Sequence, residues 1–247
     1  MDNITFKFQG GDVRATPGDS IAAALTEAGH TSFGWRRSGE PRGLYCCMGV
    51  CHDCLMTVDG QRGVRACMAT ATDGMEVQRE DERCLADNTV PPSATSFETL
   101  EAEIAVIGAG PAGLSAAIRA ANAGADVVVL DERDELGGQY FKPRSHGYRG
   151  RHKPDRQHQR GSDLRARAEE SGARIISGQS IWFARADGDG FELRSFGATG
   201  GFRLCARAVI LASGAYERPA MVQGWTMPGV MTIGGAQTLA RRYGVVP

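Results

Sequence analysis

CCMGVCHDC, residues 46–54, decides the fold of the N-terminal part of the chain, and a further cysteine follows thirteen residues later. The spacing C-x4-C-x2-C…C is one with which four thiolates bind a [2Fe–2S] cluster. Gly49 lies between the first two ligands and permits a tight loop, so backbone N–H groups can approach the inorganic sulfides. The proposed cluster ligands are Cys46, Cys51, Cys54 and Cys67.

Two other roles for these cysteines fit the spacing less well. Structural zinc sites usually combine two short pairs, whereas here the first interval is longer and Cys67 is solitary. Disulfides need an oxidising compartment, but the count of seven cysteines is odd and the N-terminus has neither a basic n-region nor an apolar h-region. Cys47 is left out because its side chain should leave the loop on the side opposite to Cys46. Cys84 and Cys205 are isolated, which is typical of small buried hydrophobes.

The residues around this loop predict a ferredoxin-like β-grasp domain of the α+β class, residues 1–84. Alternating apolar residues around Gly10-Gly11 indicate a hairpin over residues 3–16. Ser20 is a suitable N-cap for a helix that ends before Gly29. The remaining predicted strands are residues 55–58, 63–66 and 75–77.

Length and composition exclude several classes of function. The 247 residues carry a net charge of −1, which gives no electrostatic attraction to nucleic acid. No apolar run approaches the roughly 20 residues needed to span a bilayer. We therefore expect a cytoplasmic protein without a transmembrane segment. Residues 85–100 are polar and contain prolines, which predicts a linker to a second domain over residues 101–247.

The second domain begins with a dinucleotide-binding pattern. GAGPAG, residues 108–113, follows an apolar strand at 104–107 and opens a helical stretch at 114–121. Its three glycines permit a sharp turn, the approach of backbone to a pyrophosphate, and close packing of helix on strand. A second strand, 126–130, ends at Asp131, whose carboxylate is placed to accept a hydrogen bond from a ribose hydroxyl. The pattern predicts an α/β Rossmann-type fold.

Two further stretches favour FAD over NAD as the dinucleotide. Gly137-Gly138-Gln139 follows shortly after the first βαβ unit, and a second glycine pair suits close passage of the backbone beside an extended dinucleotide. The apolar strand 209–214 ends in Ala-Ser-Gly, whose small side chains let the strand end touch the cofactor. The alternative reading of each stretch, taken alone, is an ordinary turn.

The region between these motifs is less informative. Residues 142–160 are strongly basic and read as a solvated loop, whose histidines His146, His152 and His158 share no metal-binding face. Residues 162–171 read as a helix, and Trp182 and Phe183 are predicted to pack in the core of a small inserted sheet. Its predicted strands are residues 173–185, 191–195 and 202–208.

The C-terminal part carries a resemblance to a known family. The runs GAYERP at 214–219, GWTMPGVMT at 224–232 and GAQTL at 235–239 resemble the flavoprotein α subunits of bacterial amine and amino-acid oxidoreductases. Hydrogen cyanide synthase, opine oxidase, hydroxyproline dehydrogenase and heterotetrameric sarcosine oxidase belong to that group. The resemblance implies a ferredoxin-like part before a two-dinucleotide-binding flavoprotein.

The resemblance also implies cofactors, contacts and a partner. It implies FAD beside the [2Fe–2S] cluster, and a separate catalytic subunit of D-amino-acid-oxidase type that oxidises a carbon–nitrogen bond of a small amine or amino acid. The implied FAD contacts are Gly108, Gly110, Pro111, Ala112, Gly113, Asp131, Glu132, Gly138, Gln139, Ala212, Ser213 and Gly214. Related flavoproteins continue past the position of Pro247, so we expect a C-terminally truncated chain.

The sequence therefore predicts an electron-transferring subunit. No residue stands out as an acid, base or nucleophile for chemistry on a substrate, so the expected role is passage of electrons between FAD and the cluster. Two alternatives stay open: an electron carrier in which only the cluster functions because the flavin domain is cut short, and a noncatalytic scaffold subunit.

Overall fold

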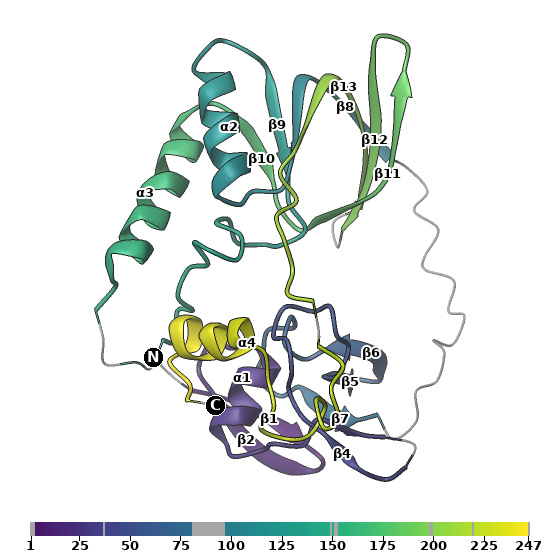
Figure 1. Cartoon of the computed structure of the whole chain (residues 1–247), viewed down its shortest axis with the longest axis vertical. Coiled ribbons are helices and arrows are strands. Elements are labelled where there is room, and N and C mark those ends of the chain that lie inside the picture. The colour runs from purple at the N-terminus through teal and green to yellow at the C-terminus, as the bar shows by residue number, and fades with distance from the viewer. Residues whose placement is uncertain are drawn as a thin grey trace. The chain divides into compact units, whose positions relative to one another are not determined.

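The computed structural model describes residues 3–36, 38–80, 97–148, 150, 153–197, 200–218 and 220–246. The chain forms two compact units (Figure 1). Unit 1 comprises Met1–Thr89, Arg144–His152 and Tyr216–Pro247, and unit 2 comprises Val90–Pro143 and Lys153–Ala215. Cys84, His152 and most of the predicted linker 85–100 lie outside the described residues. The domain limits 1–84 and 101–247 stay predictions.

Unit 1 contains a five-stranded sheet in the order β2-β1-β7-β5-β6. The first strand pairs antiparallel with β2 and parallel with β7, which is the β-grasp arrangement that the sequence predicted. Two short strands, β3 and β4, form a separate hairpin. The elements are β1 Ile4–Phe8, β2 Gly11–Ala15, α1 Ile21–Glu27, β3 Gly34–Trp35, β4 Pro41–Arg42, β5 Leu55–Val58, β6 Gln61–Arg65, β7 Glu76–Arg79, α4 Ile233–Thr238 and the π-helical turn η1 Leu239–Tyr243.

The predicted hairpin and helix build the core of this unit. Phe6, Phe8 and Val13 alternate with exposed residues, so one face of the hairpin is buried, as period-2 patterning requires. Helix α1 starts where the sequence placed it, because the Ser20 hydroxyl accepts a hydrogen bond from the Ala23 N–H at 3.2 Å. The core continues through Phe33, Met56 and Val77.

The C-terminal segment packs in unit 1 although it follows the dinucleotide-binding region in the chain. Leu239, Tyr243 and Val245 are buried in the same core as α1. The Ser145 N–H also donates a hydrogen bond to the Arg242 carbonyl at 2.9 Å. Burial of these three apolar side chains explains why a segment distant in sequence belongs to the ferredoxin-like unit.

Unit 2 is a six-stranded sheet in the order β10-β9-β8-β13-β12-β11, in which the first four strands are parallel. Helices α2 and α3 lie side by side next to β9 and β10 (Figure 1) and bury Leu114, Ala117 and Ala168. This is the predicted Rossmann-type fold. The elements are β8 Phe97–Ile107, α2 Pro111–Ala121, β9 Val127–Leu130, α3 Arg156–Glu170, β10 Arg174–Ile176, β11 Gln179–Asp187, β12 Gly190–Gly197 and β13 Gly201–Leu211.

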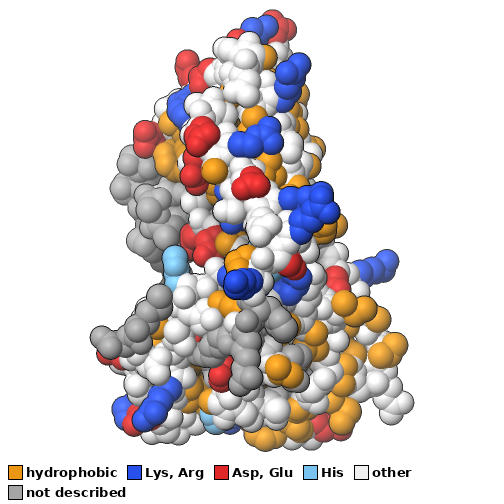
Figure 2. All heavy atoms as spheres, turned by 90° about the vertical axis from the view of Figure 1, so that its left-hand side faces the viewer, with side chains coloured by type: hydrophobic (Ala, Val, Ile, Leu, Met, Phe, Trp, Pro, Cys, Tyr) orange, Lys and Arg blue, Asp and Glu red, His pale blue; other side chains and the backbone are white. Residues whose placement is uncertain are grey.

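Two expectations for unit 2 were wrong in detail. The basic stretch 142–160 is not loop throughout, because Asp155 caps α3 by accepting a hydrogen bond from the His158 N–H at 3.0 Å. The segments 202–208 and 209–214 form one strand, β13, up to Leu211. Helix α3 buries only Gly161 and Ala168, and side chains of both charge signs mix over this side in Figure 2.

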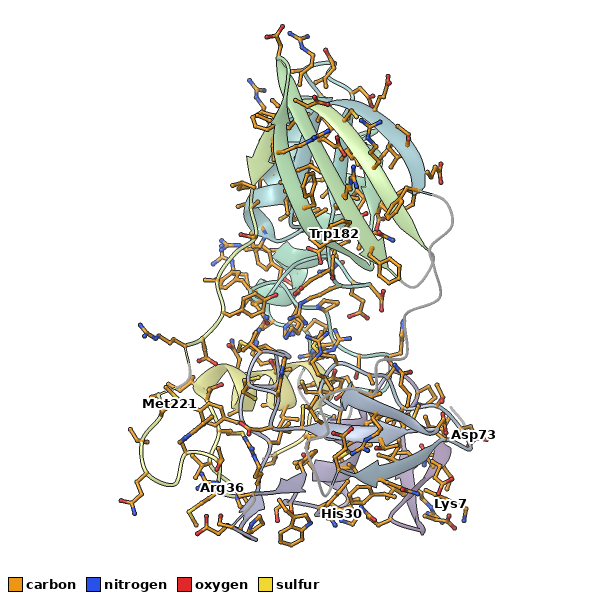
Figure 3. The ribbon with its side chains drawn as sticks, turned by 90° about the vertical axis from the view of Figure 1, so that its right-hand side faces the viewer. Lys7, His30, Arg36, Asp73, Trp182 and Met221 are labelled. Atoms are coloured by element: carbon orange, nitrogen blue, oxygen red, sulfur yellow. The ribbon has the colours of Figure 1, made fainter. Side chains whose placement is uncertain are left out.

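Trp182 and Phe183 do not form a core, which corrects the sequence-based expectation. The Trp182 side chain is 56% exposed, and Figure 3 shows it on the outer hairpin of the sheet. A register shift between Ile181 and Phe183 interrupts the pairing of β11 with β12, and Trp182 lies on the exposed face of the alternating strand. Phe183 is half-buried, and the Arg194 guanidinium lies over its ring at 5.2 Å.

Within the described ranges, no helix has the length and apolar character needed to cross a bilayer.

Candidate cluster and dinucleotide sites

The structure brings the four predicted cluster ligands together in unit 1. The loop between β4 and β5 supplies Cys46, Cys51 and Cys54, and Cys67 follows directly after β6. Pairing of β5 with β6 carries Cys67 back to the loop, and the Ala66 N–H donates a hydrogen bond to the Cys54 carbonyl at 3.0 Å. Three of the thiols are buried and Cys51 is half-buried.

The four thiols form two hydrogen-bonded pairs. The Cys51 thiol donates to Cys46 and lowers the pKa of Cys46 to about 5, while this bond and burial raise the pKa of Cys51. The Cys54 thiol donates to Cys67 in the same way, so the pKa of Cys67 falls and that of Cys54 rises. Each pair therefore contains one sulfur that favours the thiolate, the form that binds metal.

Two pairs of thiols fit the two irons of a [2Fe–2S] cluster. Each iron of such a cluster takes two protein ligands in addition to the bridging sulfides. Among the described residues, no group of three or more His, Cys, Asp or Glu side chains converges on a single metal position. A tetrahedral zinc site would need four ligands around one ion. The pairing of the four thiols matches the two protein ligands per iron of the binuclear cluster.

The backbone of the loop is wound to direct N–H groups at sulfur. Cys47, Gly49 and His52 all have positive φ, at 50°, 83° and 59°. Non-glycine residues rarely adopt this conformation, and such strain is typical of functional sites. The Met48 N–H lies 3.5 Å from the Cys46 sulfur, and a Gly49 backbone hydrogen bond to Cys67 lowers the pKa of that thiol.

Charged residues hold the loop from both sides. A buried ion pair joins the Arg42 guanidinium on β4 to the Asp53 carboxylate, which lies between two ligands. The Arg65 Nη1 donates a hydrogen bond to the Gly49 carbonyl at 3.1 Å.

Of the cysteines left out of the ligand set, Cys47 lies in the main core of unit 1. Cys205 is only half-buried on β13 rather than fully buried as predicted.

The glycines of residues 108–113 are packed so closely that no side chain fits at two of them. Gly108 has φ +102°, and a Cβ there would overlap the Ala212 carbonyl. A Cβ at Gly113 would overlap the Gly108 carbonyl, so the first turn of α2 lies directly against the end of β8. Gly110 is the N-cap of α2 and makes no side-chain cap, an arrangement that suits the predicted binding of a pyrophosphate by the N-terminal N–H groups of this helix.

The second glycine pair lies against this turn. A Cβ at Gly138, where φ is +61°, would come within 2.9 Å of the Gly110 Cα. The Gly137 N–H donates a hydrogen bond to the Ala109 carbonyl at 2.9 Å. Two glycine segments thus approach each other without side chains, which leaves a cradle for an extended dinucleotide. Gly137 belongs to the Gly137-Gly138-Gln139 pattern but was not among the predicted FAD contacts.

The other predicted FAD contacts lie at the same ends of the parallel strands. Asp131 follows β9 and is buried, and its two oxygens accept hydrogen bonds from the N–H groups of Ala109 and Arg133 at 2.5 and 2.8 Å. Glu132 and Gln139 are exposed, and the segment 212–214 follows β13. The Ala212 N–H donates to the Ile107 carbonyl at 2.8 Å. These placements are compatible with the predicted contacts, which stay predictions.

Both halves of the chain match models of known families. Residues 1–82 match the family described as 2Fe-2S iron-sulfur cluster binding domain, and residues 102–244 match Pyridine nucleotide-disulphide oxidoreductase. The second match covers more than half of the chain, which therefore belongs to the pyridine nucleotide-disulphide oxidoreductase family. FAD and a [2Fe–2S] cluster are its cofactors, as the sequence predicted.

Curated relatives confirm the resemblance stated from the sequence. The chain is 37% identical over 156 residues to an opine oxidase subunit of Agrobacterium tumefaciens (strain Ach5), covering 59% of this chain and 30% of the relative. It is 25% identical over 264 residues to the alpha subunit of sarcosine oxidase from Corynebacterium sp. (strain U-96), covering 98% of this chain and 27% of the relative. It is 33% identical over 81 residues to the HcnA subunit of hydrogen cyanide synthase from Pseudomonas aeruginosa, covering 33% and 78%.

A solved structure confirms the fold of the whole chain. The crystal structure of L-proline dehydrogenase from P. horikoshii matches with a TM-score of 0.78 and 23% identity, covering 100% of this chain and 48% of that chain. This likeness concerns the fold alone. The chain spans about 30% of the length of its opine oxidase relatives and less than half of the dehydrogenase chain.

Proposed function

We propose that this chain passes electrons between FAD and a [2Fe–2S] cluster within a bacterial complex that oxidises an amine or amino acid. The observation that carries the proposal is the convergence of four cysteines as two thiol pairs in a chain that also has the dinucleotide fold. Bound FAD exchanges two electrons and the cluster exchanges one, so together they convert paired electrons to single ones.

The protein contributes binding and electrostatics to this reaction. The N–H groups at the start of α2 bind the pyrophosphate, and Gly110 and Gly138 leave room for it. Asp131 and Glu132 bind the ribose, and the small residues Ala212, Ser213 and Gly214 contact the flavin part. In unit 1 the four cysteine thiolates hold the cluster, and the backbone N–H groups of the loop stabilise its negative charge.

The names of the relatives support the assignment to a complex. The matched opine oxidase, sarcosine oxidase and hydrogen cyanide synthase chains are each named as one subunit of their enzyme. We infer a hetero-oligomer in which a partner subunit of D-amino-acid-oxidase type oxidises a small amine or amino acid and delivers electrons to FAD on this chain. We also infer a cytoplasmic location.

Cofactor analysis of anaerobically purified protein tests the proposal. We expect flavin and iron–sulfur absorbance together in the wild-type chain, and loss of iron without loss of flavin in Cys51→Ala. Cys205→Ala is the matched control, because this half-buried cysteine lies on β13 outside the cluster loop. Protein without flavin and without iron would contradict the proposal.

The same samples separate the two alternatives. Iron with no retained FAD would favour a carrier in which only the cluster functions. A stable complex with a partner subunit that is unaffected by Cys51→Ala, in a chain that holds neither cofactor, would favour a noncatalytic scaffold.

A further inference from the structure

The stretch that leads into the first cluster ligand is hydrogen-bonded at two positions to a segment about 180 residues further along the chain. The Gly43 N–H donates a hydrogen bond to the Thr226 carbonyl at 2.8 Å. Two residues later, the Tyr45 carbonyl accepts a hydrogen bond from the Thr232 N–H at 3.0 Å. Residues 225–235, which we name the cover segment, therefore cross residues 43–46 twice within unit 1.

Glycine at each crossing lets the two backbones touch. A Cβ at Gly43 would come within 2.7 Å of the Pro228 Cα and 2.8 Å of the Met227 carbonyl oxygen. A Cβ at Gly235 would come within 2.7 Å of the Tyr45 carbonyl oxygen. Both glycines are buried, and neither has a positive φ. They are therefore required by the close approach and not by local backbone conformation.

Thr226 anchors the cover segment. This residue is only 3% exposed, and its hydroxyl accepts a hydrogen bond from the Arg36 Nε at 2.8 Å as well as a contact from Arg36 Nη2. Arg36 follows β3 and also pairs with Glu40 at 3.3 Å, so the β3–β4 hairpin fixes the guanidinium. The anchor places the residue before Thr226 over the cluster loop.

That residue is Trp225, which packs against the group that contains the first ligand, Cys46. Its ring meets the Tyr45 ring edge-on, with centroids 5.0 Å apart and an interplanar angle of 74°. Trp225 and Cys51 are the two half-buried residues packed against a small buried group formed by Tyr45, Cys46 and Met48. The indole and the more exposed ligand Cys51 thus pack against the same small group, which contains the first ligand.

We propose that the cover segment shields the iron bound by Cys46 and Cys51 from water and, through Trp225, sets the reduction potential of the cluster. Water stabilises the more negatively charged reduced cluster, so shielding lowers the reduction potential. Trp225 acts through packing and is a positioning residue. The inference rests on the cluster assignment of the proposed function and is independent of the substrate.

Two substitutions remove the cover in different ways, and each has a matched control. Gly43→Ala inserts a methyl group at the first crossing, whereas Gly34→Ala adds the same group in the same hairpin with no atom within 4 Å. Trp225→Ala removes the indole, whereas Trp225→Phe keeps a ring edge against Tyr45. The full chain is purified without oxygen, and the cluster is titrated potentiometrically with low-temperature EPR detection.

We expect Gly43→Ala and Trp225→Ala to raise the ratio of reduced to oxidised cluster at a fixed potential by about tenfold, a positive shift of about 59 mV for one electron. Both variants should also lose the cluster faster in air, while Gly34→Ala and Trp225→Phe should match the wild type. An unshifted potential in Trp225→Ala would overturn the inference even if Gly43→Ala fails to fold. A wild-type chain without iron would instead contradict the proposed function, and this inference with it.

Discussion

Asp131 closes the turn at the end of β8, because its Oδ2 accepts a hydrogen bond from the Ala109 N–H at 2.5 Å across 22 residues. The same carboxylate accepts from the Arg133 N–H through Oδ1. A residue chosen from the sequence as a ribose ligand therefore also shapes the glycine turn that is predicted to bind the pyrophosphate. A carboxylate oxygen has two lone pairs, so both tasks are compatible.

Asp131→Asn should weaken FAD binding. In the wild type the carboxylate accepts hydrogen bonds from two backbone N–H groups, those of Ala109 and Arg133. The NH2 group of an asparagine cannot accept, so one of these two hydrogen bonds is lost and the turn opens there. We expect retained flavin after gel filtration to fall by about tenfold, given a loss of about 1–3 kcal/mol. Asp163→Asn on the exposed side of α3 is the control, and equal flavin retention in the two variants would refute this role of Asp131.

Gly138→Ala should abolish FAD binding with little effect on the cluster. The new Cβ would come within 2.9 Å of the Gly110 Cα and would fill the cradle between the two glycine segments. Gly124→Ala is a matched control, because Gly124 also has positive φ but has no atom within 4 Å of the added methyl. Flavin content relative to iron is the measurement, and a Gly138→Ala chain with full flavin would show that the cradle lies elsewhere.

The ion pair of Arg42 and Asp53 should matter far more than a surface pair. Removing one partner of a buried pair leaves an uncompensated charge, which costs about 3–5 kcal/mol. We expect Asp53→Asn to lower the free energy of unfolding by an amount of this order in urea titrations. The exposed pair of Lys7 and Asp12 provides the control, since Asp12→Asn should cost at most about 1 kcal/mol. Similar losses in both variants would contradict the account.

Glu192 should make stability depend on pH in the acid range. Hydrogen bonds from Arg194, Arg203 and Arg185 lower the pKa of its carboxyl from 4.5 to about 2. A lowered pKa in the folded state stabilises the protein above pH 4.5, and this contribution disappears as the pH falls towards 2. Glu192→Gln should therefore have a lower Tm than the wild type at neutral pH.

The difference in Tm between wild type and Glu192→Gln is measured at each pH. It should shrink between pH 4.5 and 2, where Glu192 becomes protonated in the wild type as well. Glu103→Gln, in an exposed pair with Arg207, should show no such trend. A difference that stays constant over this range would mean that the three arginines do not act through the charge of Glu192.

The parts of the site that the sequence predicted are those encoded by short spacings. Three cluster ligands fall within nine residues, and the turn that returns Cys67 is read from Asp59-Gly60. The spacing of the glycines before α2 is likewise local, although Gly108 packs against Ala212, about 100 residues further along the chain. Local patterns therefore sufficed for the two folds and for the cluster, whereas the choice of FAD also used the distant stretch 209–214 and the family resemblance.

The parts that the sequence missed depend on contacts between distant segments. Arg36 and Thr226 are 190 residues apart, and nothing in either segment indicates their hydrogen bond. Trp182 lies on the exposed face of β11, and the sequence of one strand does not reveal which face the rest of the unit leaves exposed. Gly43 and Gly235 mark a close approach because they are buried without positive φ, but neither burial nor φ can be read from the sequence.

The central claim is that FAD and a [2Fe–2S] cluster on this chain exchange electrons, and an anaerobic dithionite titration tests it most directly. Flavin absorbance and low-temperature EPR are recorded on the same oxygen-free samples, after chemical analysis of iron, sulfide and flavin. We expect about two irons, two sulfides and one flavin per chain, with a paramagnetic reduced cluster that appears as the flavin bleaches. Metal-free protein, or a cluster signal that never appears while the flavin is reduced, would contradict the claim.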